Sequence, residues 1–134
     1  MRGGNDPRMQ TYAIDASYVL AFLLPDEIDE DVARTFARYQ CREIELISTT
    51  LLPFEVMNGL LVAYRKKRIH TDFLNTAADL FTRLHIPLSE IDHHEALAFA
   101  HLHALTVYDA GYAQLAAQQS CVLLTKDAQL LRLS

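Results

Sequence analysis

Four acidic residues stand where regular elements of the chain are expected to begin or end. They are Asp15, Glu55, Asp109 and Asp127. Two of them follow apolar runs typical of strands, and the other two lie in the first turns of expected helices. Because the carboxyl ends of parallel strands meet at one edge of a sheet, where ligands bind, we expect these four acids to converge there.

Each acid taken alone also has an ordinary structural explanation, because Asp is a common helix N-cap and Glu is favoured in a first turn. Taken together they are harder to explain. At separations of about 5 Å and an effective dielectric constant of about 20, each pair would repel by about 3 kcal/mol. The six pairs would cost on the order of 20 kcal/mol, more than a marginally stable fold tolerates. We therefore expect some acids to be protonated or a hard cation such as Mg²⁺ or Mn²⁺ to bind.

The elements that must position these acids alternate between short apolar runs and helical periodicity. Expected strands span residues 11–14, 44–47, 86–88 and 121–124. Expected helices span residues 17–24, 29–40, 53–66, 71–84, 92–103, 108–119 and 127–131. Alternation with short connections, and strands that are apolar on both faces, predict the α/β class. We expect a three-layer α/β/α arrangement around a central parallel sheet of four to five strands.

Length and composition describe a single folded domain. The chain has 134 residues, of which 51% are hydrophobic and 22% charged, which excludes a disordered or fibrous protein. We expect residues 1–8 to be a disordered extension and residues 9–134 to form one domain. No apolar run approaches the roughly 20 residues of a membrane span, and the N-terminus lacks the apolar region of a secretory signal. Cys41 and Cys121 are interpreted as reduced, buried thiols of a cytoplasmic protein.

The net charge of −5 disfavours nonspecific binding to nucleic acids. Four consecutive residues nevertheless form a basic run, which consists of Arg65, Lys66, Lys67 and Arg68. Subtracting the four acids from −5 leaves −1 for the rest of the chain. The basic run is either a favourable set of cations at a helix C-terminus or a phosphate track that leads to the acids, and the two interpretations are compatible.

Around the four acids the sequence resembles the PIN domain, and most closely the VapC-type toxin ribonucleases of toxin–antitoxin pairs. The resemblance covers residues 12–131. The matching stretches are IDAS (14–17), FEVMN (54–58), LTVYDA (105–110) with Tyr112, and LLTKD (123–127). One short acidic motif would carry little weight, whereas four in order, each in its expected helix or strand context, form a specific pattern.

The resemblance implies a PIN-like fold and an acidic pocket that holds Mg²⁺ or Mn²⁺ through Asp15, Glu55, Asp109 and Asp127. Supporting hydroxyls would come from Ser17 and Thr125, and less strongly from Thr106, since a hydroxyl can orient a carboxylate. The implied activity is that of an endoribonuclease, in which a metal-activated water hydrolyses RNA phosphodiester bonds. The implied partners are an RNA substrate, a cognate antitoxin that blocks the site, and a second copy in a homodimer.

Two other functions remain open. A receiver-like phosphoacceptor domain has a similar length and uses acids with Thr and Lys, as in Thr125-Lys126. Its acceptor Asp would follow a central strand, whereas the acid after the second expected strand is Glu55 on a helix. The other alternative is a PIN-fold binding module without catalysis. A zinc site is disfavoured, because no two histidines of residues 93–103 have the i, i+4 spacing that lets them share an ion.

Overall fold

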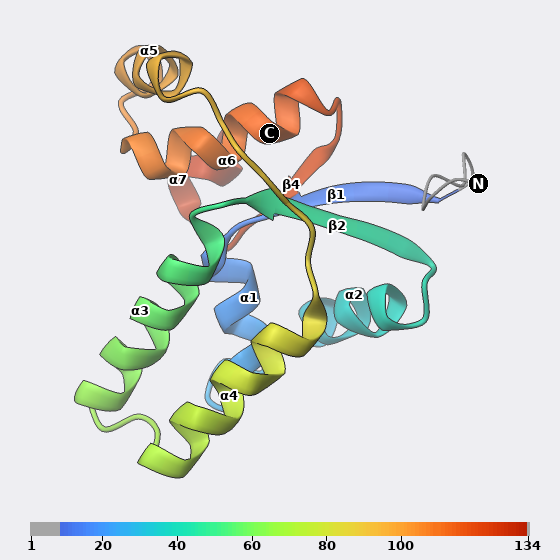
Figure 1. Ribbon diagram of the computed structural model, residues 1–134, viewed down its shortest axis with the longest axis vertical. Helices are drawn as coiled ribbons and strands as arrows, with labels where there is room; N and C mark the ends of the chain where they lie inside the picture. Colours follow the sequence, from blue (N-terminus) through green and yellow to red (C-terminus); the bar gives the residue numbers. More distant parts are fainter. Residues whose placement is uncertain (1–8, 134) are drawn as a thin grey trace.

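The computed structural model describes residues 9–133. The strands are β1 (Gln10–Ile14), β2 (Ile44–Thr49), β3 (Leu88–Ser89) and β4 (Val122–Leu124). The helices are α1 (Ala16–Leu23), α2 (Glu30–Gln40), α3 (Leu52–Arg65), α4 (Thr71–Leu84), α5 (His93–His103), α6 (Val107–Gln118) and α7 (Ala128–Leu131), as Figure 1 shows. The extension expected at residues 1–8 lies outside the described residues.

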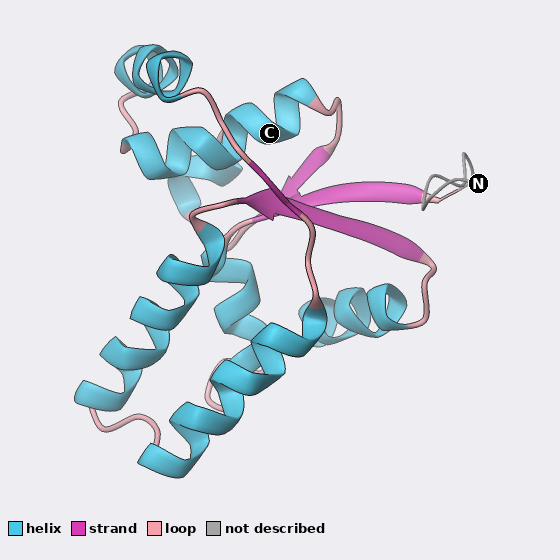
Figure 2. Cartoon of the chain, in the orientation of Figure 1, coloured by secondary structure: helices cyan, strands magenta, loops and turns pink. Residues whose placement is uncertain are grey.

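The strands form one parallel sheet in the order β3-β2-β1-β4 (Figure 2). Tyr12 at the centre of β1 pairs with Leu46 of β2 on one side and with Val122 of β4 on the other. A parallel sheet with crossover helices is the architecture predicted from the alternating pattern. The prediction of four to five parallel strands is confirmed.

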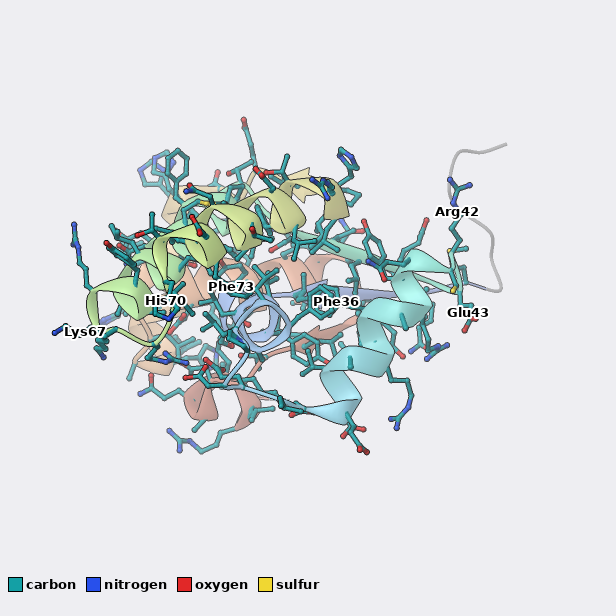
Figure 3. All side chains as sticks on the ribbon, turned by 90° about the horizontal axis from the view of Figure 1, so that it is seen from below. Phe36, Arg42, Glu43, Lys67, His70 and Phe73 are labelled. Atoms are coloured by element: carbon teal, nitrogen blue, oxygen red, sulfur yellow. The ribbon has the colours of Figure 1, made fainter. Side chains whose placement is uncertain are left out.

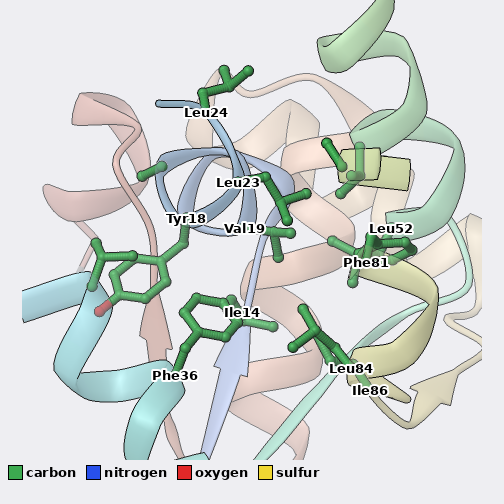
Figure 4. Close-up of a cluster of buried hydrophobic side chains, with 14 of the residues drawn as sticks. Ile14, Tyr18, Val19, Leu23, Leu24, Phe36, Leu52, Phe81, Leu84 and Ile86 are labelled. Atoms are coloured by element: carbon green, nitrogen blue, oxygen red, sulfur yellow. The ribbon is translucent and has the colours of Figure 1, made fainter. Parts of the chain in front are cut away.

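Helices cover both faces of the sheet and form the two outer layers of a three-layer arrangement (Figure 1). Helices α1 to α4 lie on one face, where large side chains such as Ile14 and Phe36 form the main core (Figure 4). Helix α6 packs on the other face, with α5 against it, and a smaller cluster there joins Ala13 to Leu115 and Ala116. Alternation along β1 explains the difference, since Ala13 and its neighbour Ile14 point to opposite faces.

Helices α1 and α3 are in close contact at a glycine. Gly59 of α3 faces Leu20 of α1, and a Cβ atom at Gly59 would lie 2.3 Å from the Cδ1 atom of Leu20. A side chain at residue 59 would therefore require the Leu20 side chain to move. The glycine leaves room for the Leu20 side chain between α1 and α3.

Three details differ from the sequence-based expectations. The third strand is Leu88–Ser89 instead of residues 86–88. Pro87 has no backbone N–H to donate to β2, although its carbonyl accepts a hydrogen bond from the Ser48 backbone at 3.0 Å. Cys41 is exposed, since it caps the end of α2, and Cys121 is half-buried, so neither thiol is buried as expected. Several helices begin one residue away from the expected start.

Among residues 9–133, none of the helices has both the length and the apolar character required to cross a bilayer.

Candidate active site

The four acids line one cavity of about 360 Å³ at the carboxyl-terminal edge of the sheet. The starts of α1, α3 and α6 gather at this edge, to the left of the strands in Figure 1. The cavity lining consists of Asp15, Ala16, Ser17, Leu51, Phe54, Glu55, Asn58, Gly59, Tyr108, Asp109, Tyr112 and Asp127. The convergence expected from the parallel sheet is therefore observed, although the elements that carry these residues are far apart in sequence.

Asp15 is the most deeply placed of the acids, with 3% of its surface exposed. It is the N-cap of α1, and its Oδ1 atom accepts hydrogen bonds from the Tyr18 backbone N–H at 3.0 Å and from the Ser17 hydroxyl at 2.7 Å. Its Oδ2 atom accepts a hydrogen bond from the Thr125 hydroxyl. Burial raises the pKa of Asp15, and the charge of Asp109 adds to that effect, while the three hydrogen bonds oppose it.

Ser17 and Thr125 connect the start of α1 to the loop before α7. While each donates to Asp15, the Ser17 oxygen accepts from the Lys126 backbone N–H at 2.8 Å, and the Thr125 oxygen accepts from the Asp127 backbone N–H at 2.9 Å. The two hydroxyls lie 3.3 Å apart. They thus fix the Asp15 carboxylate and the backbone that presents Asp127 in one hydrogen-bond network.

Glu55 occupies the first turn of α3 and is half-buried. The hydroxyl of Tyr112, on α6, donates a hydrogen bond to its Oε1 atom. Burial raises the pKa of Glu55, and the charges of Asp109 and Asp15 raise it further, while the Tyr112 hydrogen bond lowers it. Tyr112 is itself 1% exposed, and its burial and the adjacent carboxylate raise the pKa of its hydroxyl, so that it stays a donor.

Asp109 and Asp127 lie half-buried at the starts of α6 and α7. The Thr106 hydroxyl caps α6 by accepting the Asp109 backbone N–H at 3.0 Å, so Thr106 supports the helix that carries the acid. Burial raises the pKa of Asp109, and the charge of Asp127 raises it further. Asp127 is the N-cap of α7 and accepts the Gln129 backbone N–H at 2.8 Å.

The charged side chains that line the cavity in the described part of the chain are all acidic. Of the residues that the structure describes, no Lys, Arg or His lines the cavity. The nearby Lys126 points instead to Asp29, with which it forms an ion pair. Hydrogen bonds offset part of the effect of burial and repulsion on Asp15 and Glu55, but no cationic side chain of the described residues pairs with the acids in the cavity, which is the pattern expected of a functional site and not of a structural ion-pair network.

The donor set fits a hard divalent cation. All candidate ligands are carboxylate oxygen atoms, which are the ligands that Mg²⁺ and Mn²⁺ prefer. Within residues 9–133, no three acid, His or Cys side chains lie close enough to hold one ion together. Each acid is drawn to its own element by hydrogen bonds such as those of Asp15 and Asp127. Because Mg²⁺ keeps several waters and takes only one or two carboxylates directly, this looser arrangement suits an ion held partly through water.

The basic run is not part of this cavity. It lies at the opposite end of α3 from Glu55, at the tip that Lys67 and His70 mark in Figure 3. Arg68 forms two hydrogen bonds of 2.7 Å with Asp26 and one of 3.0 Å with Glu27. These carboxylates raise the pKa of the Arg68 guanidinium above its usual value. At least this member of the run thus has a structural partner.

Sequence reasoning assigned no role to several residues that line the cavity. Tyr112 positions Glu55, Asn58 lies one turn after Glu55, and Phe54 and Tyr108 stand on the rim. Helical spacing was the available clue, because residues three apart share a helix face. Asn58 is three residues after Glu55, and Tyr112 is three residues after Asp109.

Comparison with known proteins gives three findings. The family model described as PIN domain matches residues 12–134, which include all four acids. A curated protein named Ribonuclease VapC3, from Pyrobaculum aerophilum, is 32% identical over 121 residues, which cover 87% of this chain and 89% of that protein. The crystal structure of PAE2754 from Pyrobaculum aerophilum matches with a TM-score of 0.72 at 26% identity, over 92% of this chain and 84% of that one.

Proposed function

Because the chain belongs to the PIN domain family, as a protein of the VapC type, we propose that it is a metal-dependent endoribonuclease and the toxin of a toxin–antitoxin pair. The observation that carries the proposal is the cavity into which Asp15, Glu55, Asp109 and Asp127 converge, and which no cationic side chain of residues 9–133 lines. The ribonuclease name of the similar Pyrobaculum protein supports the same activity.

The four acids would hold Mg²⁺ or Mn²⁺, and the protein would orient them in advance. When bound, the ion supplies a hydroxide near neutral pH and stabilises negative charge on the phosphate oxygens. Asp15 would be held by Ser17 and Thr125, and Glu55 by Tyr112. Hydrogen bonds of this kind fix the rotamer and the basicity of a metal-binding carboxylate.

Water is the proposed nucleophile, because no Cys or His of the described chain lines the cavity. It attacks the phosphorus in line, the bond from phosphorus to the 3′ oxygen breaks, and the leaving oxygen takes up a proton. The products are a 5′-phosphate and a 3′-hydroxyl. The half-buried acids Glu55, Asp109 and Asp127 are accessible to the substrate, while the buried Asp15 lies at the bottom of the cavity.

We further propose a cognate antitoxin, a homodimer and a cytoplasmic location. An antitoxin segment with a basic side chain would find in the cavity a cluster of carboxylates without cations, and would thereby block the site. The basic run at the far end of α3 is proposed to contact RNA phosphates.

A receiver-like phosphoacceptor function has weaker support. A phosphoacceptor carboxylate must be free to attack, and both Asp15 oxygens already accept hydrogen bonds within the protein. No specific contact in the cavity favours this function over the nuclease.

The decisive experiment measures cleavage of defined RNAs with Mg²⁺ or Mn²⁺ and with a chelator, for the wild type and for Asp109→Asn. We expect metal-dependent cleavage that falls at least about 100-fold in the variant, since removal even of groups that only support a metal ligand costs about 10- to 100-fold. Asp72→Asn is the matched control, because Asp72 is also a first-turn aspartate but lies on α4, outside the cavity. Unchanged cleavage by Asp109→Asn would reject the assignment.

A second readout tests metal binding without catalysis. At a Mg²⁺ concentration of 100 times its Kd, binding stabilises the folded state by about 2.7 kcal/mol. We expect Mg²⁺ to raise the Tm of the wild type and of Asp72→Asn, and to raise that of Asp109→Asn much less. If Mg²⁺ and Mn²⁺ leave the Tm unchanged and no RNA is cleaved, the protein is a PIN-fold binding module without this catalysis.

A further inference from the structure

Two exposed aromatic side chains stand on the rim of the cavity. Phe54 is 78% exposed and Tyr108 is 57% exposed, and both line the cavity that contains the four acids. Each directly precedes an acid in the sequence, Phe54 before Glu55 on α3 and Tyr108 before Asp109 on α6. The two rings therefore approach the same opening from two different helices.

The core does not account for these rings. Neither Phe54 nor Tyr108 belongs to the two buried hydrophobic clusters of the fold. A single exposed apolar residue needs no explanation, since much of any protein surface is apolar. Two large aromatics beside two acids of one cavity are different, because water exposure of a Phe ring forgoes the stabilisation that burial would bring. Their position indicates that they meet a ligand.

The charges that line the cavity indicate which part of a ligand the two rings contact. Within the described residues, the charged groups that line the cavity are all carboxylates, so the protein itself repels phosphate there. Bound cations can neutralise the acids, but the attraction for a nucleotide must also come from uncharged groups. The faces of aromatic rings provide it, because every nucleobase stacks on them whatever its sequence.

We propose that Phe54 and Tyr108 bind an unpaired base of the RNA by stacking and thereby place the adjoining phosphodiester over the acids. The inference rests on the proposed nuclease function and adds the class of substrate. A base inside a duplex is already stacked on both faces, so the enzyme acts on single-stranded segments. Because stacking tolerates every base, the two rings set the position of cleavage and not its sequence preference.

The test compares kcat/KM for a short single-stranded RNA among Phe54→Ala, Tyr108→Ala and the wild type. Loss of a stacking ring weakens binding roughly 5- to 100-fold, and we expect that loss mainly in KM. Tyr108→Phe keeps the ring and should restore most of the wild-type value. Leu102→Ala, on α5, is the matched control, because Leu102 is 77% exposed, lies outside the cavity and should leave kcat/KM unchanged.

A second arm removes the base in place of the ring. An RNA with one abasic nucleotide beside the cleaved bond keeps its sugar and phosphate but cannot stack. If stacking is the interaction, the abasic substrate and Phe54→Ala each reduce kcat/KM, and their combination reduces it little further. Multiplicative effects of the two changes would contradict the proposal.

The outcomes separate this inference from the function on which it rests. If the wild type cleaves no RNA with Mg²⁺ or Mn²⁺, the nuclease function fails and stacking fails with it. If the wild type cleaves and both alanine variants match it, only the stacking inference fails. Unchanged cleavage together with a change of mass in light scattering would place the rings in a protein interface, which also overturns the inference.

Discussion

Helix α3 carries a charged group at each end, and the fold treats the two ends differently. At its start, Glu55 shares a cavity with three other acids, and the cations of the described chain lie elsewhere. At its end, the basic run closes with Arg68, which binds the carboxylates of Asp26 and Glu27. One end thus has uncompensated charge, whereas the other has at least part of its charge paired.

The pKa directions express the same contrast. The pKa of Glu55 is raised, because burial and neighbouring acids both disfavour its charge. The pKa of Asp26 is lowered, mainly through its hydrogen bond with Arg68, so its charge is favoured. The role of a charge cluster in the sequence therefore depends on which charged groups the fold places beside it. Four acids that share one cavity, three of them with a raised pKa, indicate a ligand site, whereas an arginine paired with carboxylates indicates a structural role.

The comparison between the two ends of α3 predicts the largest effect for Glu55→Gln. Glutamine keeps the shape and can still accept the Tyr112 hydroxyl, but removes the charge. RNA cleavage should fall at least about 100-fold. Thermal unfolding without divalent cations should show an equal or higher Tm, because one repelling charge is gone. A clear fall in Tm with retained cleavage would show that Glu55 is structural.

The next largest effect is expected for Tyr112→Phe. This change removes the hydroxyl that holds Glu55 and leaves the buried ring in place. Cleavage should fall about 10- to 100-fold, as for other groups that orient a metal ligand. Tyr64→Phe, also at a hydroxyl that takes part in a hydrogen bond but at the far end of α3, is the control and should retain activity. Equal activity of the two variants in steady-state kinetics would contradict the positioning role.

A smaller effect would sharpen the account of the basic end. If Lys66 and Lys67 contact phosphates, Lys66→Ala/Lys67→Ala should raise KM several-fold with little change in kcat. The slope of log affinity against log salt should fall by about 1.4, because each phosphate contact on a single strand contributes about 0.7. Arg83→Ala, at the other end of α4, is the control. An unchanged salt slope in fluorescence-anisotropy titrations would show that the basic run does not contact phosphates and only supplies favourable charge at the helix C-terminus.

The smallest effect is expected for Arg68→Gln, and it concerns stability. Arg68 lowers the pKa of Asp26 below its usual 3.8, so the pair stabilises the fold above that pH. This stabilisation is lost as the pH falls through the lowered pKa. The variant should therefore have a lower Tm than the wild type at pH 7, and the difference should shrink below about pH 3.8. Calorimetry between pH 7 and acid is the measurement. A Tm difference between the wild type and the variant that grows as the pH falls would contradict the prediction.

Much of the fold was predictable from local patterns. Alternating apolar runs and helical periods predicted the parallel sheet between helix layers, and Thr71–Leu84 was expected at the observed bounds. Asp29, Asp92 and Asp127 each stand one residue before a helix as its N-cap, which explains why those expected starts were one residue early. Caps and periodicity are properties of neighbouring residues, so a sequence displays them directly.

The convergence of the four acids also followed from the sequence, because parallel strands end at a common edge and helices start there. What the sequence could not show is how each acid is held. The depth of Asp15, the contact of Tyr112 with Glu55 and the exposure of Phe54 depend on how three helices pack. The pairing of Arg68 with Asp26 joins residues 42 positions apart. Such partners are chosen by packing across the whole fold, where shape and burial decide which charged groups meet and which remain open to a ligand.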